Sequence, residues 1–157
     1  MSNLLIDDEL ITSHGALSVY HAAIDELARR YDGFDEEIHL QAQEMLPPRG
    51  LFLVARADRH PVGGVGVRPI GDDALMLGEV KRLWVRPDQR RLGVAAKLMS
   101  ALVERARQSG FTQLYLETGY AQPEAVAFYQ KIDWTPIEKF PDGAFSYPTA
   151  YRFTKIL

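Results

Sequence analysis

A turn rich in arginine and small residues constrains the fold of this chain more than any other segment. It occupies positions 90–95 and reads Arg-Arg-Leu-Gly-Val-Ala. An apolar run at residues 80–85 precedes it, and a helical pattern follows it to about Ser109. A strand that leads into a tight turn and then a helix directs several backbone N–H groups and the positive end of the helix dipole at one point. The segment therefore predicts an anion site, and we expect it to bind a pyrophosphate.

The same six residues also fit a plainer interpretation, in which a glycine near a helix start and two solvated arginines bind nothing. Two familiar nucleotide motifs are absent, because neither G-x-G-x-x-G nor G-x-x-x-x-G-K-[ST] occurs in the sequence. A Rossmann dinucleotide site and a P-loop nucleotide triphosphatase are therefore not supported. The interpretation that we follow is a phosphate-bearing cofactor bound through main-chain amides.

The bulk properties indicate one globular domain that covers residues 1–157. Apolar residues make up 46% of the chain and charged residues 25%, which is ordinary for a soluble protein. The net charge of −3 argues against nucleic-acid binding and slightly favours a cationic acceptor. Because the chain has no cysteine, disulfides, thiolate metal ligands and a cysteine acyl-enzyme are excluded.

Targeting and metal signals are absent from the sequence as well. No run of residues has the length and apolarity of a membrane span, and the acidic N-terminus does not resemble a secretory signal. We therefore expect a cytoplasmic protein that does not bind membranes. The four histidines lack metal-ligand spacing and no carboxylate cluster suggests a metal, so no metal site is expected.

Apolar periodicity predicts both helices and strands. Helical spacing covers residues 16–31 and 95–109, with a weaker helix at 34–45 and a last one that begins at Pro123. Strands are expected at residues 4–11, 51–55, 62–67, 75–85, 114–118, 134–140 and 150–156. Three glycines within 62–67 indicate either the close approach of a backbone or ligand, or a strongly twisted strand.

Four segments, in this order, resemble the GNAT superfamily of N-acetyltransferases. Residues 79–87 resemble the family's fourth strand. Arg90-x-x-Gly93-x-Ala95 matches the [RQ]-x-x-G-x-[GA] signature with which that family holds the pyrophosphate of acetyl-CoA. Residues 114–118 resemble the fifth strand, and residues 122–134 the A-x-x-[FL]-Y-x-K-x-G-[FW] segment. The resemblance extends from about residue 51 to residue 134.

This resemblance implies a GNAT fold of the α/β class, with a mixed, mostly antiparallel sheet of about seven strands. Helices flank the sheet, and strands 4 and 5 splay apart where the cofactor binds. The implied activity is acetyl transfer from acetyl-CoA to a primary amine by direct attack in a ternary complex. The acceptor is a small-molecule or peptide amine that the sequence does not identify, and a homodimer is compatible with the family. A non-catalytic acyl-CoA sensor and transfer of another acyl group remain alternatives.

The resemblance also suggests catalytic residues. Glu79 stands where histone acetyltransferases of the family have their general base, although an ion pair with Lys81 on the same strand face is an equal alternative. Glu117 is the reserve candidate. Tyr129 matches the tyrosine that donates a proton to the coenzyme A thiolate, and a core aromatic is its alternative role. Strict alternation would place Glu79, Lys81, Leu83 and Val85 on one strand face and Val80, Arg82 and Trp84 on the other.

Cofactor contacts follow from the same resemblance. The backbone of residues 83–85 is expected to pair with the pantetheine arm, and a backbone N–H there, best that of Val85, to polarise the thioester. Gln122 replaces an asparagine that is frequent in the family, and Asp133 replaces a glycine. The expected cofactor-binding residues are Leu83, Trp84, Val85, Arg90, Arg91, Leu92, Gly93, Val94, Ala95, Ala96, Gln122 and Tyr129. Aromatic residues expected around the acceptor pocket are Tyr120, Phe140, Phe145 and Tyr147.

Overall fold

The computed structural model describes residues 3–32 and 42–157. Their strands form one seven-stranded sheet in the order β1-β2-β3-β4-β5-β7-β6. Neighbouring strands are antiparallel except β4 and β5, which are parallel. The predicted α/β class and the mixed, mostly antiparallel sheet are therefore confirmed.

The elements lie close to the predicted positions. The strands are β1 (Leu4–Asp8), β2 (Leu51–Ala57), β3 (His60–Ile70), β4 (Leu77–Val85), β5 (Gln113–Thr118), β6 (Thr135–Ile137) and β7 (Tyr151–Ile156). The helices are α1 (His14–Arg30), α2 (Val94–Gln108) and α3 (Pro123–Lys131), with 3-10 turns η2 (Ala42–Met45), η3 (Asp73–Leu75) and η4 (Pro87–Gln89). The strand expected at 134–140 is much shorter. The helix expected at 34–45 lies mostly outside the described residues, and its end forms η2.

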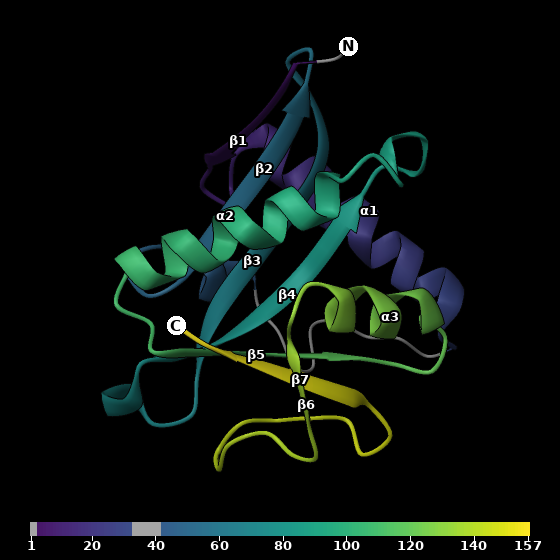
Figure 1. Cartoon of the computed structure of the whole chain (residues 1–157). Coiled ribbons are helices and arrows are strands. Elements are labelled where there is room, and N and C mark those ends of the chain that lie inside the picture. Colours follow the sequence, from purple (N-terminus) through teal and green to yellow (C-terminus); the bar gives the residue numbers. More distant parts are fainter. Residues whose placement is uncertain (1–2, 33–41) are drawn as a thin grey trace.

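Helices cover both faces of the sheet. α2 and α3 lie on one face and α1 lies on the other (Figure 1). Alternation along β2 contributes to both cores, because Leu51 and Leu53 pack under α2 whereas Phe52 and Val54 pack under α1. The sheet is therefore buried on both sides around β2, β3 and β4.

α1 is fixed at both ends. The Ser13 hydroxyl caps its N-terminus by accepting a hydrogen bond from the Ala16 N–H at 3.2 Å. At its C-terminus, the Arg30 guanidinium donates to the Ala121 carbonyl at 2.9 Å and to the Glu124 carboxylate at 2.6 Å. The last turn of α1 is thereby tied to the start of α3, on the far side of β4.

The glycines of β3 allow side chains to lie directly on the strand. A Cβ added at Gly64 would lie 2.8 Å from Val19 Cγ1, and one added at Gly66 would lie 2.8 Å from Phe52 Cδ2. The close approach at these two glycines is therefore made by side chains of the α1-side core, whereas the sequence pattern indicated a backbone or a ligand.

β4 contains a bulge at Arg82. Gly64 pairs with Trp84 and Gly66 pairs with Lys81, so β4 has one residue more than β3 in this interval. Arg82 takes a left-handed conformation with φ of 62°. Lys81 and Trp84 consequently lie on the same face, toward α1. The predicted strict alternation along this strand is therefore wrong beyond Lys81.

Candidate active site

β4 and β5 pair only at their N-terminal ends and then diverge. The last register pair joins Glu79 to Tyr115. Beyond it, β4 continues to Val85 and β5 to Thr118 without pairing with each other. The predicted splay between strands 4 and 5 is thus confirmed. Within the described residues, no strand lies beside the β5-facing edge of β4 beyond Glu79.

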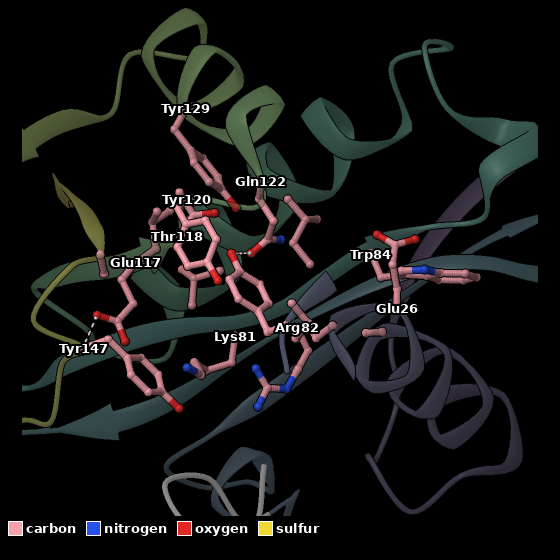
Figure 2. Close-up of a pocket in the computed structure, with 18 of the residues that line it drawn as sticks. Glu26, Lys81, Arg82, Trp84, Glu117, Thr118, Tyr120, Gln122, Tyr129 and Tyr147 are labelled. Atoms are coloured by element: carbon pink, nitrogen blue, oxygen red, sulfur yellow. Dashed lines mark hydrogen bonds between the residues drawn. The ribbon is translucent and has the colours of Figure 1, made fainter. Parts of the chain in front are cut away.

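A cavity of about 400 Å³ occupies this splay (Figure 2). Its wall is built by the two diverging strands, the C-terminal half of α1, Gln122 before α3 and Tyr129 within α3, and the segment before β7. Polar residues on the wall include Lys81, Arg82, Glu117, Thr118, Gln122 and Tyr129. Functional groups from distant parts of the sequence are therefore brought to one cavity.

The cavity has two chemically different sides, because side chains alternate along β5. Leu116 and Thr118 point toward the α2 and α3 side, whereas Glu117 points toward the α1 side. Lys81 on β4 and Glu117 on β5 occupy corresponding positions, each two residues beyond the last pair of the parallel register. They therefore face each other across the opening of the splay.

Tyr129 extends from α3 toward the cavity and lines it (Figure 2). Its ring also contacts the rings of Phe128, Phe153 and Trp134 at centroid distances of 5.3, 5.7 and 6.4 Å. Burial raises the pKa of Tyr129 well above that of a free phenol. Its hydroxyl therefore remains protonated at neutral pH, as a hydrogen-bond donor must.

Thr118, at the end of β5, was not singled out as a site residue by the sequence. Its side chain is 6% exposed and lines the cavity, and its Oγ1 has no hydrogen-bond partner among the described residues. A buried hydroxyl without a partner costs about 1–3 kcal/mol. A ligand in the splay would satisfy it. A threonine in a strand gives no sign of this in the sequence, because the missing partner is a property of the tertiary structure.

Glu117 is held at the α1 side of the cavity by the segment that precedes β7. Its Oε2 accepts hydrogen bonds from the Ser146 hydroxyl at 2.5 Å and from the Tyr147 N–H at 3.2 Å. Figure 2 shows Glu117 beside Tyr147. Burial raises the pKa of Glu117, and the Ser146 hydrogen bond and the Lys81 charge only partly oppose this effect. Its Oε1 makes no hydrogen bond within residues 3–32 and 42–157.

Glu79 does not line the cavity. It is fully buried and lies directly opposite Arg68 in the β3–β4 register. Arg68 donates to Glu79 Oε1 from Nε at 3.0 Å and from Nη2 at 2.8 Å, and Lys81 Nζ lies 3.5 Å from Oε2. The arrangement favours the structural alternative, an ion pair that includes Lys81, and it adds a cross-strand arginine that the sequence did not indicate.

The arginine-rich turn has the geometry of an anion site. Gly93 has φ of 83° and precedes the first residue of α2, and no side chain caps that helix end. A Cβ at Gly93 would meet no atom within 4 Å, so the space in front of the helix is open. Arg91, also left-handed with φ of 64°, is exposed and makes no ion pair in the described part of the chain. Of the other predicted residues here, Leu92 is exposed, Val94 is buried, and Ala95 and Ala96 are partly buried.

Two residues predicted to contact the cofactor form hydrogen bonds with Glu26 of α1 and with Tyr31, the residue that follows α1. Arg90 donates from Nε to the Val85 carbonyl at 2.7 Å and from Nη2 to the Glu26 carboxylate at 2.5 Å. Gln122 accepts a hydrogen bond from the Tyr31 hydroxyl at 3.2 Å. Glu26 and Tyr31, whose segment carried no recognisable motif, therefore connect both edges of the splay.

The remaining predicted residues fall into two groups. Leu83 and Trp84 line the cavity, whereas the Val85 side chain packs in the core beneath α2. Among the aromatic residues, Tyr120 and Tyr147 line the cavity, while Phe140 is buried and Phe145 packs edge-on against Tyr147. Asp133 takes φ of 66°, a left-handed conformation that aspartate tolerates better than most residues.

In the described ranges, no three or more His, Cys, Asp and Glu side chains are grouped so that they could hold a metal ion. None of the helices described is both long and apolar enough to cross a membrane.

Comparisons with known proteins agree with this geometry. The model of the acetyltransferase (GNAT) family matches residues 18–134. The match covers well over half of the sequence, and the chain belongs to this family.

Individual relatives are more distant. The IAA acetyltransferase of Azospirillum brasilense is 36% identical over 92 residues, which cover 59% of this chain and 59% of that protein. N-acetyltransferase 8 of Homo sapiens is 34% identical over 83 residues, which cover 52% of this chain and 37% of that protein. The chain spans about half the length of the curated relatives it matches.

Solved structures share the fold along the whole chain. A GNAT family acetyltransferase from Elizabethkingia anophelis, solved with acetyl-CoA bound, has a TM-score of 0.70. The alignment covers 99% of each chain at 16% identity.

Proposed function

We propose that this protein is an N-acetyltransferase that moves the acetyl group of acetyl-CoA directly to a primary amine in a ternary complex. The observation that carries the proposal is the cavity between the diverging strands. It combines an open edge of β4, two buried hydroxyl groups and a carboxylate on the opposite side. An uncapped helix N-terminus follows the same strand.

Three features of the chain fit acetyl-CoA. The N–H groups at the start of α2, with the open space beside Gly93, suit the diphosphate. The edge of residues 83–85 on β4, which does not pair with β5, suits the amides of the pantetheine arm, although Arg90 already donates to the Val85 carbonyl. The orphaned Thr118 hydroxyl suits a polar atom of the same arm. The bound thioester supplies the activated acetyl group.

Glu117 is the general base in this proposal, in place of Glu79. Glu117 lines the cavity, whereas Glu79 is enclosed between Arg68 and Lys81. The raised pKa of Glu117 brings it closer to neutral pH, where a general base works best. Glu117 therefore accepts the proton of the attacking amine, and Glu79 keeps the cations of the neighbouring strands in place.

Tyr129 faces the departing sulfur from the α3 side and donates a hydrogen bond to it. Its pKa lies above that of an ordinary thiol, which is about 8.5. Complete proton transfer from Tyr129 to the thiolate is therefore uphill, and the hydroxyl acts mainly by stabilising the developing negative charge.

A first test is coenzyme A release with acetyl-CoA and a panel of primary amines. Amine-dependent release with matching formation of the acetylated amine supports the proposal. Saturable acetyl-CoA binding without release on any amine would instead identify a sensor, and no saturable binding would remove the proposed anion site.

A charge placed at the turn should disrupt cofactor binding selectively. We expect Gly93→Asp to weaken acetyl-CoA binding at least about tenfold more than Gly93→Asn, because only the aspartate repels a diphosphate. Asn and Asp both tolerate the left-handed backbone at this position, so the pair differs in charge alone. Isothermal titration with acetyl-CoA measures the difference, and equal affinities for the two variants would contradict diphosphate binding at this turn.

Thr118→Val should raise the stability of the protein and raise its KM for acetyl-CoA. Removing a buried hydroxyl without a partner is expected to raise Tm by about 2–4 °C. The same change should raise KM for acetyl-CoA about fivefold, since it removes one hydrogen bond to the ligand. Thr118→Ser keeps the hydroxyl and should retain the KM of the parent. A valine variant with unchanged KM would show that the hydroxyl does not contact the cofactor.

A further inference from the structure

Two consecutive cationic side chains line the cavity of the splay. In a regular strand Lys81 and Arg82 would point to opposite faces. The bulge, with Arg82 at φ of 62°, breaks this alternation, and both residues contribute to the cavity wall. Figure 2 shows the two side chains beside each other, on the same side of the cavity as Glu117 and Tyr147. The bulge thus gathers positive charge at the place where an acceptor must lie.

Among the described residues, the positive charge of Lys81 is only partly neutralised. The Lys81 side chain is 14% exposed, and its one carboxylate neighbour within ion-pair distance in the described residues is Glu79, at 3.5 Å. The other carboxylate oxygen of Glu79 accepts hydrogen bonds from two N–H groups of Arg68. Burial lowers the pKa of Lys81, and the charges of Arg82 and Arg68 lower it further, although Glu79 and Glu117 oppose them. An additional anion beside Lys81 would therefore be stabilised.

Lys81 and Glu117 lie on opposite walls of the side of the cavity where we place the acceptor. They face each other from corresponding positions of β4 and β5, where the strands have begun to separate. Glu117 offers Oε1 to an amine, because its Oε2 is occupied by Ser146 and Tyr147. An amine at Glu117 thus has Lys81 across the splay and Arg82 on the same cavity wall, and this placement suits a molecule that carries opposite charges close together.

Two other carboxylates of the described residues lie on the cavity wall. Glu26 is paired with Arg90 and lies 3.5 Å from Arg30, and Asp32, two residues beyond the end of α1, is exposed.

We propose that the acetyl acceptor carries a carboxylate next to its amine, as an α-amino acid does, and that Lys81 and Arg82 bind this carboxylate while Glu117 takes the amine proton. This inference rests on the proposed N-acetyltransferase function. It disfavours polyamines, whose second cation would face Lys81 and Arg82, and also peptide lysines, which have no carboxylate beside the reacting amine.

The test compares three matched probes for each of several side chains: the α-amino acid, its carboxamide and the corresponding amine without the carboxyl group. Coenzyme A release gives kcat/KM for each probe. We expect the acid to exceed its amide and its decarboxylated amine at least about tenfold, which is the effect of a charge-assisted hydrogen bond. The amide has the less basic amine, so it would be the better nucleophile at neutral pH in the absence of carboxylate recognition.

Variants connect the preference to the two cations. Lys81→Met and Arg82→Gln should each reduce the acid-to-amide ratio about tenfold, through KM for the acid, and leave KM for acetyl-CoA unchanged. A ratio measured within one variant is insensitive to a loss of folded protein. Lys139→Met, an exposed lysine that does not line the cavity, is the matched control and should keep the parent ratio.

The outcomes separate the two proposals. If amides or simple amines are acetylated as well as the acids, or if the ratio survives both substitutions, the carboxylate subsite is wrong and the N-acetyltransferase function stands. If acetyl-CoA binds but no member of the three series is acetylated, the carboxylate subsite is overturned, and acetylation of other amines decides the function. If no amine of any class is acetylated, both proposals fail.

Discussion

Glu117→Gln should lower kcat/KM by roughly 10²–10⁴-fold at neutral pH, the range expected for loss of a general base. Glutamine retains the size of the side chain and can still accept the hydrogen bonds from Ser146 and Tyr147. The substitution removes only the ability to take a proton. Acetyl-CoA affinity should therefore remain close to that of the parent, and titration calorimetry can check this separately from turnover.

The pH dependence gives a second signature of the same residue. Burial raises the pKa of Glu117, so the parent should lose activity, as pH falls, at a higher pH than an ordinary glutamate would impose. The sign follows from the base being active when deprotonated, so the rate is retained above the raised pKa and lost below it. In Glu117→Gln this acid limb of the kcat/KM profile should disappear.

Glu79→Gln is the informative comparison, because it changes the other carboxylate on the same side of the sheet. Its expected effect is on stability. Arg68, whose side chain is 8% exposed, would lose its buried carboxylate partner but still lie 3.3 Å from Glu44, so the cost is at most that of a fully broken buried pair, about 3–5 kcal/mol. Tm should fall while the acid limb of the profile remains. If the limb vanishes in Glu79→Gln and persists in Glu117→Gln, then Glu79 is the base.

The features that the sequence predicted well are local ones. Gly93 lies between a strand and a helix within a few residues of both, and its left-handed φ of 83° is what a glycine at that turn suggests. The apolar stripe of α2 and the proline at the start of α3 act over similarly short distances. The splay itself came from the resemblance to a family, since nothing in β4 or β5 shows where their pairing ends.

Local sequence features could not distinguish Glu117 from Glu79 as the candidate general base, because the distinction depends on contacts between distant segments. Arg68 lies opposite Glu79 only because β3 and β4 pair in one particular register. The bulge at Arg82 then changes which side chains share a face, and an arginine in a strand gives no sign of a positive φ. Likewise, Glu26 reaches Arg90 from α1 across the fold, so a residue expected at the phosphate also belongs to an ion pair.

Tyr129→Phe is expected to reduce kcat about 100-fold, the effect of removing one donor to a developing negative charge. Phenylalanine keeps the ring contacts with Phe128, Phe153 and Trp134, so the core around α3 should be preserved. Since the hydroxyl acts on the departing sulfur, acetyl-CoA affinity and KM for the amine should change little. Steady-state kinetics gives kcat and KM for the amine, and a separate titration gives the acetyl-CoA affinity.

Tyr115→Phe provides the matched control for this prediction. Tyr115 is another tyrosine of the same sheet region whose pKa burial raises, and it packs against Phe140 and does not line the cavity. Loss of its hydroxyl should leave kcat unchanged. If Tyr129→Phe also turns over within a few fold of the parent, the hydroxyl does not assist thiolate departure. Tyr129 would then act only as part of the core that supports α3 and the wall of the cavity.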